Sequence, residues 1–255
     1  MRVAVAGKGG SGKSTVAGTM ARMLARRGDK VLVIDTDPLP GLAVSLGMGP
    51  LDGALLEDAV ERNDQGRWRL RKGIGAARAV QRYSVEGPDG VRLLQFGKAS
   101  AEGLGPVTGS LSGLYQLVHR LARDKVLDGW HVIGDMPAGP RQTAFNWAPY
   151  TKTIVVVVEP TWQSVLTARR IVKIARMREG AEPVLVANKV KTDEDIDEVE
   201  RRMKQRPLTA IPADPEARAA DEAGVALFDY APSSESVRSI EELVKTLERD
   251  YGVER

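Results

Sequence analysis

The sequence predicts an α/β fold: a doubly wound, mostly parallel sheet of about seven strands with helices on both faces. Three observations support this prediction. Short apolar runs rich in β-branched residues alternate with longer amphipathic stretches, a glycine-rich loop directly follows the first run, and acidic residues close two later runs. Alternation of this kind is typical of a parallel sheet that helices cover on both sides.

The predicted elements follow one another along the whole chain. The expected strands are residues 2–6, 30–35, 91–96, 130–135, 153–159, 183–189 and 208–212. The expected helices are residues 13–27, 112–123, 162–178, 194–204 and 234–249. Because no linker or internal repeat interrupts this order, we expect a single α/β domain over residues 1–255.

Composition narrows the possible chemistry. The chain has 255 residues, a formal net charge of +3 and no cysteine, which excludes disulfides, thiolate metal sites and ligation of an iron–sulfur cluster by this chain. The first apolar run is too short for a signal peptide. No run reaches the roughly 18 apolar residues of a membrane span. We therefore expect a cytoplasmic protein with no stable membrane insertion.

Residues 39–90 interrupt the alternation, because they contain several glycines and no convincing sheet strand. Around residues 60–90 we expect an insertion-like basic segment. Within this segment, residues 65–85 include six arginines and lysines and contain no acidic residue. The aromatic residues Trp68 and Tyr83 lie between these basic residues. A solvated helical insertion and a surface for an acidic partner both fit this composition.

The glycine-rich loop fits two phosphate-binding patterns. Gly7 to Gly12 reads G-x-G-x-x-G after a strand, and Asp35 closes the next strand, as in a dinucleotide-binding fold. Lys13 and Ser14 extend the match to G-x-x-x-x-G-K-[ST], the P-loop, which a dinucleotide site does not need. The longer match therefore favours a nucleoside triphosphate.

A P-loop holds phosphates with backbone N–H groups and a helix N-terminus. Lys13 is expected to reach the β and γ phosphates, and the Ser14 hydroxyl to bind Mg²⁺. The predicted phosphate-binding residues are Gly9, Gly10, Ser11, Gly12, Lys13, Ser14, Thr15 and, from a later loop, Gly139.

Acidic residues at the ends of two other strands complete the predicted site. Asp135 ends the run 130–135 and is expected to join Ser14 in holding the metal. Asp37 follows the run 30–35 and is expected to order the attacking water and to share the metal shell. For Asp35 two roles stay open, namely tuning the metal shell or capping its strand.

The segment KGGSGKST (8–15) resembles the deviant Walker A motif, K-G-G-x-G-K-[ST], of the MinD/ParA family of ATPases. That family includes the nitrogenase iron protein, the tail-anchored-protein targeting ATPases and the CooC-type maturation ATPases of nickel carbon monoxide dehydrogenase. DTDP (35–38) and DMPAG (135–139) are similar to its switch I and switch II. Three further segments are similar to the CooC-type versions, namely residues 155–171, 186–190 and 211–224.

The resemblance implies an ATPase that uses ATP/ADP and Mg²⁺ and forms a homodimer when ATP is bound. Lys8 occupies the position of the family's lysine that reaches the partner subunit's ATP, so it is expected to be catalytic together with Lys13 and Asp37. Asn188 is expected to bond the adenine edge. The other adenine-binding residues expected are Lys189, Pro212, Ala213 and Asp214.

Two departures from the family pattern matter. CooC-type proteins carry a Cys-x-Cys pair after the third strand, where this chain reads AEGLGPVTGS (101–110), so cysteine-based metal binding does not carry over. The usual switch I asparagine is Gly41 here, in a DPLPGL segment that two prolines stiffen.

Two biological roles remain open. The first is an ATPase that assists maturation or assembly of a client protein. The alternative is a ParA-like positioning ATPase whose ATP-bound dimer binds DNA non-specifically. Two basic surfaces could serve DNA, namely Arg169, Lys173 and Arg176 on one helix and Arg201, Arg202, Lys204 and Arg206 at the end of the next. Membrane binding in the MinD manner is disfavoured by the acidic C-terminal stretch.

Overall fold

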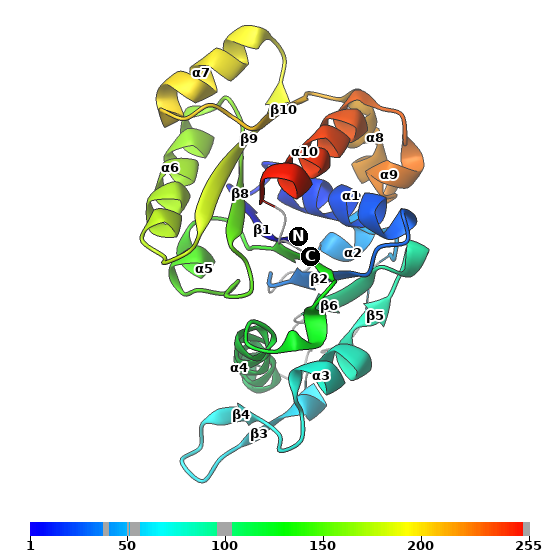
Figure 1. The fold of residues 1–255 in the computed structure, drawn as a ribbon, viewed down its shortest axis with the longest axis vertical. Helices are drawn as coiled ribbons and strands as arrows, with labels where there is room; N and C mark the ends of the chain where they lie inside the picture. Colours follow the sequence, from blue (N-terminus) through cyan, green and yellow to red (C-terminus); the bar gives the residue numbers. More distant parts are fainter. Residues whose placement is uncertain (38–40, 50, 52–56, 96–103, 252–255) are drawn as a thin grey trace.

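In the computed structural model, an eight-stranded sheet runs through the molecule and helices cover both of its faces (Figure 1). The strand order is β10-β9-β8-β1-β7-β2-β6-β5. The structure describes residues 1–37, 41–49, 51, 57–95 and 104–251, with the side chains of 57 and 104–107 excepted. The predicted fold class, a mostly parallel α/β sheet, is confirmed.

Seven adjacent strands of the sheet are parallel, and most of their residues are buried. In sheet order, these strands are β10 (Thr209–Pro212), β9 (Glu182–Val190), β8 (Thr153–Val158), β1 (Arg2–Gly7), β7 (His131–Asp135), β2 (Val31–Asp35) and β6 (Arg92–Gln95). Every residue of β2 and β8 is buried, as their continuous apolar sequences require of strands covered on both faces. Each of these strands lies close to its predicted bounds.

Alternate residues of each strand face the two sides of the sheet. Val31 and Val33 pack with the helices α1 (Lys13–Arg26), α2 (Leu42–Ser45), α8 (Pro215–Ala223), α9 (Leu227–Tyr230) and α10 (Glu235–Tyr251). Leu32 and Ile34 belong to the core under α3 (Ala76–Tyr83), α4 (Leu104–Leu121), α6 (Trp162–Arg176) and α7 (Asp193–Met203). The short helix α5 (Arg141–Ala144) packs against α6. In the described part of the chain, no helix has the length and apolar content that a bilayer crossing requires.

The carboxyl ends of the central strands meet at one edge of the sheet. Val5 of β1 is in register with Asp135 of β7, and Asp135 is in register with Asp35 of β2. The glycine-rich loop leaves β1 at this same edge and enters α1. Because ligands of open parallel sheets bind outside these carboxyl ends, the fold brings the predicted nucleotide residues to one place.

The expectation that residues 39–90 contain no sheet strand is wrong. β3 (Val60–Arg62) and β4 (Trp68–Leu70) form an antiparallel hairpin, and β5 (Val85–Glu86) pairs antiparallel with β6 at the edge of the main sheet. These strands have two or three residues each, too few for the alternation of apolar and polar residues to mark them. The remaining short elements are three 3₁₀ turns at Glu57–Ala59, Pro88–Gly90 and Lys125–Leu127.

The aromatic residues of the basic segment 65–85 are packing residues. Tyr83 is 5% exposed, and Trp68 covers Gly109 of α4, where a Cβ would lie 3.2 Å from the indole ring. Two of the segment's arginines pair with acids outside it, Arg69 with Glu61 at 2.9 Å and Arg82 with Asp58 at 2.5 Å. The segment therefore contains the second strand of the hairpin, β4, and the helix α3, both packed on α4, rather than a solely helical insertion.

The four-residue helices α2, α5 and α9 were not predicted, and two of the longer helices also differ from the sequence prediction. α4 begins at Leu104 instead of residue 112, because glycines and a proline in its first turns lower the helix propensity there. α8 was not predicted, although Asp214 and Pro215 are typical of a helix start. The Asp214 carboxylate accepts the Glu216 N–H at 2.9 Å and so caps α8.

Candidate nucleotide-binding site

The glycine-rich loop between β1 and α1 needs glycine for two different reasons. Gly10 and Gly12 have φ angles of 77° and 91°, in the left-handed region that residues with a Cβ avoid. Gly7 has no room for a side chain, because a Cβ there would lie 2.5 Å from the Val157 carbonyl oxygen. The glycine spacing therefore permits the tight turn that leads into α1.

Inside the loop, the Lys8 carbonyl accepts two hydrogen bonds. The Ser11 N–H and the Lys13 ammonium each donate to it at 3.2 Å, and Lys13 is only 8% exposed. The N–H groups of Lys13, Ser14 and Thr15 begin α1, so they have no acceptor within the helix. A buried ammonium beside these N–H groups makes this helix end suited to phosphate.

Two side chains from the end of β9 donate to the carbonyl oxygens of the loop. Asn188 is 7% exposed, and its amide nitrogen lies 2.7 Å from the Ser11 carbonyl oxygen. Lys189 Nζ lies 2.6 Å from the Gly10 carbonyl oxygen and 2.9 Å from Glu159 Oε1. The sequence did not predict these bonds, because 177 residues separate Asn188 from Ser11 and only the folded sheet brings them together.

Two predicted site residues make contacts within the loop region. The Lys8 ammonium lies 3.4 Å from the Gly9 carbonyl oxygen, on the exposed side of the loop. The Gly139 N–H donates to the Gly7 carbonyl at 2.9 Å, and Gly139 has a φ of 89°. The Gly139 N–H must leave its present acceptor before it can donate to a phosphate, whereas the Lys8 ammonium has further N–H donors available.

Ser14 and Asp135 form the polar pair beside the loop. The Ser14 hydroxyl donates to Asp135 Oδ2 at 2.6 Å, and Asp135 is 4% exposed. Adjacent ligands of an octahedral Mg²⁺ lie about 2.9 Å apart, so a small separation of these two oxygens admits the ion. Asp135 Oδ1 is buried and has no hydrogen-bond partner among the described residues. Both observations fit a Mg²⁺ site.

Burial is the main cause of the raised pKa values of the two acids at the carboxyl ends of β2 and β7. Burial raises the pKa of the Asp135 carboxyl to about 6, although the Ser14 hydroxyl and the Lys13 ammonium act in the opposite direction. Burial, reinforced by the Asp135 carboxylate, raises the pKa of Asp35 to about 8. A cation placed between these acids would favour their charged forms.

Of the two roles left open for Asp35, the structure supports capping. Asp35 is fully buried, and its carboxylate accepts the N–H groups of Asp37 at 2.9 Å and Leu42 at 3.3 Å. Thr36 donates both its N–H and its hydroxyl to the Asp135 carbonyl, at 3.1 and 2.9 Å. These bonds hold Asp37 near Asp135, at the carboxyl ends of β2 and β7. Residues 38–40 of the predicted switch I lie outside the described residues.

A cavity of about 700 Å³ joins the loop to the predicted adenine side. At one end it is lined by Gly12, Lys13 and Ser14. All the residues predicted to bind adenine line it as well, namely Asn188, Lys189, Pro212, Ala213 and Asp214. The structure therefore brings the phosphate and adenine predictions together in one cavity.

Several lining residues were missed by the sequence reading. They come from α8, α9 and α10 and include Ala217, Asp221, Leu227, Ser236 and Ile240. The Asp214 carboxylate explains their position, because it accepts N–H groups from both Glu216 at the start of α8 and Ser236 in α10. The Asp-Pro pair at the start of α8 was the signal that could have placed that helix beside the loop.

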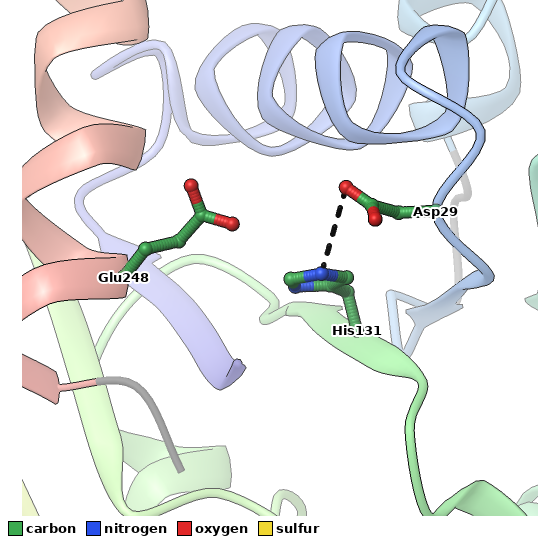
Figure 2. A group of neighbouring side chains, drawn as sticks. All are labelled: Asp29, His131 and Glu248. Atoms are coloured by element: carbon green, nitrogen blue, oxygen red, sulfur yellow. Dashed lines mark ion pairs between the residues drawn. The ribbon is translucent and has the colours of Figure 1, made fainter. Parts of the chain in front are cut away.

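A second polar cluster lies at the amino end of β7, opposite to the carboxyl end that carries Asp135. There Asp29, His131 and Glu248 point toward one another (Figure 2). His131 begins β7, whereas Asp135 ends it. The Arg27 guanidinium pairs with Asp29 at 2.8 Å and with Glu248 at 2.6 Å, and burial lowers the pKa of His131. Arg27 already supplies the cation that the two carboxylates need, so this cluster is an ion-pair network and not a metal centre.

Comparison with known proteins places these features in context. The model of the 4Fe-4S iron sulfur cluster binding proteins, NifH/frxC family, matches residues 1–253. The carbon monoxide dehydrogenase accessory protein CooC of Rhodospirillum rubrum is 29% identical over 248 residues, which cover 91% of each chain.

Two solved structures share the fold. The cell division ATPase MinD of Pyrococcus furiosus superposes with a TM-score of 0.73 at 22% identity, over 97% of this chain and 98% of that chain. The septum site-determining protein MinD of Pyrococcus horikoshii, solved with Mg-ADP, gives a TM-score of 0.74 at 17% identity, over 100% and 99% of the two chains. At these identities the likeness is one of fold.

Proposed function

Because the chain belongs to the NifH/frxC family and has the P-loop ATPase fold of the MinD/ParA and CooC-type proteins, we propose that it is an ATP-hydrolysing dimeric switch that acts on a client protein. The family membership confirms the resemblance seen in KGGSGKST. The nucleotide, the dimer and the client are the proposal.

The observation that carries the proposal is the 2.6 Å pair of Ser14 Oγ and Asp135 Oδ2 beside the buried Lys13. A dinucleotide site needs neither a metal-binding hydroxyl nor a buried lysine at this place. A Mg²⁺-bound triphosphate needs both, together with an acid at a neighbouring strand end.

The iron–sulfur cluster in the family's description does not fit this chain. Such clusters are held by cysteine thiolates, with histidines as the occasional substitute. The chain has no cysteine, and its histidines are His119 and His131. His131 belongs to the ion-pair network with Arg27 at the opposite sheet edge. We therefore derive no step from a cluster.

In the proposed reaction each residue acts mainly by position and charge. Bound Mg²⁺ supplies neutralisation of the phosphate charge, and Ser14 and Asp135 are the residues that would hold it. The Lys13 ammonium donates to the terminal phosphates. Asp37, held in place through Asp35, orders the attacking water. Lys8 reaches the nucleotide of the second subunit and stabilises the charge that develops during transfer.

Adenine fills the far end of the cavity in this proposal. Pro212 and Ala213 provide the apolar contacts there, and the Asp214 carboxylate fixes their loop through its bonds to α8 and α10. Asn188 Nδ2 donates one of its two hydrogens to Ser11, and the Asn188 carbonyl oxygen is the acceptor that would take the adenine amino group.

A client protein is the proposed target because the CooC relative is an accessory protein of carbon monoxide dehydrogenase. Switches of this type act by holding loops in place with the terminal phosphate and releasing them on hydrolysis. Delivery of a metal by cysteine is not part of the proposal, since the chain has none. Nucleotide-gated binding of the client does not require it.

DNA binding is the second candidate, favoured by the arrangement of α6 and α7. Arg169 donates to the Arg202 carbonyl, and Arg176 donates to Gln205 at 3.0 Å, so the two predicted basic surfaces form one. Arg202 also pairs with Glu198, which reduces the charge available to phosphates. The exposed cation Lys173 lies on this surface.

ATP hydrolysis in single-turnover reactions tests the main proposal. Wild-type protein should release phosphate from Mg-ATP, Asp37→Ala should bind ATP without hydrolysis, and Ser14→Ala should lose the Mg²⁺ dependence of binding. A wild-type protein that binds Mg-ATP but releases no phosphate, alone or with native lysate, would contradict the ATPase assignment.

Fluorescence anisotropy with random-sequence duplex DNA separates the two roles. A positioning role requires binding by Asp37→Ala with Mg-ATP, a steep loss of affinity as salt rises, and weakening by Lys173→Glu. Absence of ATP-dependent binding at low salt would discard that role. Capture of one enzyme by ATP-loaded Asp37→Ala, unaffected by nuclease, would support the client role instead.

A further inference from the structure

We propose that Lys189 and Glu159 form a strap that positions the phosphate-binding loop, so that Lys189 serves nucleotide binding through Gly10 rather than through contact with adenine. The strap is the pair of contacts from Lys189 Nζ to the Gly10 carbonyl oxygen and to Glu159. This inference rests on the proposed function, because it concerns how the same site holds phosphate.

A β-bulge turns Lys189 toward the loop. Ile211 of β10 pairs with Asn188 and the next residue, Pro212, pairs with Val190, so the pairing skips Lys189. Lys189 has a φ of 58°, a conformation that residues with a Cβ adopt only under constraint. Bulges near functional sites commonly redirect one side chain. Here the redirected side chain is the lysine that reaches Gly10.

Glu159 keeps the lysine at this position. Glu159 directly follows β8 and is 14% exposed, whereas Lys189 is 50% exposed. The Glu159 carboxylate lies mostly out of solvent and pairs with the Lys189 ammonium at 2.9 Å. This charged hydrogen bond restricts the movement of the lysine side chain. The contact therefore ties the ends of β8 and β9 to the phosphate-binding loop.

The strap and Asn188 together fix two consecutive peptide planes of the loop. The Gly10–Ser11 plane is held at its oxygen by Lys189 and at its N–H by the Lys8 carbonyl, at 2.6 and 3.2 Å. The next plane, Ser11–Gly12, is held at its oxygen by Asn188. Because a trans peptide points its N–H opposite to its C=O, fixing the Ser11 oxygen also fixes the direction of the Gly12 N–H. Donors fixed in advance bind phosphate without a cost for ordering them.

Charge also argues for a positioning role. The Lys189 ammonium has two acceptors already, and the Glu159 carboxylate balances its charge. Lys13, by contrast, is buried at the start of α1, where the phosphates are expected. Lys13 is therefore the binding lysine, and Lys189 is a positioning residue for the loop.

Two probes separate positioning from adenine contact. Mg-ADP carries adenine and phosphates, whereas inorganic tripolyphosphate with Mg²⁺ carries phosphates alone. Competition against a fluorescent ADP analogue gives both affinities for wild type, Lys189→Met and Lys189→Arg. We expect Lys189→Met to weaken both probes by the same factor, about tenfold, which equals about 1.4 kcal/mol. Lys189→Arg keeps a donor and should recover part of the loss.

A loss of ADP affinity with tripolyphosphate unchanged would overturn the strap and make Lys189 an adenine-binding residue. No change in either affinity would also overturn it. An unchanged thermal unfolding midpoint in Lys189→Met shows that the loss is local. Wild-type protein that binds neither ADP nor ATP would instead contradict the proposed function, before any variant is compared.

A double-mutant cycle tests the role of Glu159. The effect of Glu159→Gln on the affinity for Mg-ADP should disappear in the Lys189→Met background, because the two residues act through one contact. Equal effects in both backgrounds would show that Glu159 acts independently of Lys189 and would remove it from the strap.

Discussion

At the scale of single residues, the buried acids at the carboxyl edge should make stability depend on pH. The pKa of Asp35 is raised to about 8 and that of Asp135 to about 6, both above the ordinary carboxyl range. Between that range and about pH 8 the folded protein therefore binds more protons than the unfolded chain. Its free energy of unfolding should fall as pH rises through this window.

Asp35→Asn tests this dependence, because an amide carries no titrating proton. Without nucleotide or Mg²⁺, urea unfolding should show a smaller decrease in stability from about pH 6 to about pH 8 in this variant than in wild type. Asp64→Asn, at an exposed turn between β3 and β4, is the control and should keep the wild-type slope. The same slope in Asp35→Asn and wild type would contradict the raised pKa.

A second residue-scale prediction concerns Gly12. An added Cβ would collide with the Asn188 amide nitrogen, and the φ of 91° is itself unfavourable for alanine. Gly28 is a matched control, since it has a φ of 88° but open space around it. Both alanine variants should lose roughly 1–2 kcal/mol of stability. Calorimetry should show that Gly12→Ala alone loses nucleotide affinity, by about tenfold or more, and equal affinities in the two variants would refute the collision.

Some residues of the site could be predicted from the sequence, and others could not. Lys13, Ser14 and Asp135 were predicted and lie together, because each follows or ends a buried strand at one sheet edge. The strap was not predicted. The bulge at Lys189 depends on pairing with β10, and nothing in the local sequence reveals it.

At the scale of elements, one buried arginine joins several of them. Arg22 of α1 is 2% exposed, donates to the Leu46 carbonyl at the end of α2, and pairs with Asp229 of α9 at 2.6 Å and Asp89 at 3.0 Å. The cavity residue Leu227 lies on the same helix as Asp229. Arg22 thus connects α1 with α2, which follows the predicted switch I, and with α9, which lines the cavity.

Replacing Arg22 with methionine should be strongly destabilising, because it removes the buried cation shared by two carboxylates and leaves them only the half-exposed Arg26, which lies 3.2 Å from each. We expect a loss of about 3 kcal/mol in urea unfolding, at the lower end for a broken buried pair since Asp89 and Asp229 remain 25% and 34% exposed. Arg218→Ala removes an exposed pair with Glu222 and should change stability little. Similar losses in both variants would contradict the role assigned to burial.

Element length decided which elements the sequence could predict. The strands of the parallel sheet are apolar runs buried on both faces, so each was found. β3, β4 and β5 are shorter than any periodic pattern needs and depend on pairing with distant residues. The predicted start of α4 was too late, because Gly109 lowers the helix propensity of its first turns. In the structure this glycine makes room for Trp68.

At the scale of the whole molecule, the predicted parallel α/β sheet places the loop, the acids and the predicted adenine residues around one shared cavity at the carboxyl ends of its strands. What the sequence could not predict is how distant surfaces combine. The two basic stretches of α6 and α7 became one surface, where the Arg169 and Arg202 guanidinium groups lie over Trp162, a side chain 55% exposed. Such contacts follow from helix packing and not from local composition.

Sedimentation velocity of Asp37→Ala, with Mg-ATP and with Mg-ADP, tests whether ATP controls dimer formation. We expect a dimer with ATP, a monomer with ADP, and a monomer with either nucleotide when Lys8→Ala is added, because Lys8 acts across the interface. A species whose mass is the same with either nucleotide, or a dimer that Lys8→Ala leaves intact, would contradict a nucleotide-gated dimeric switch.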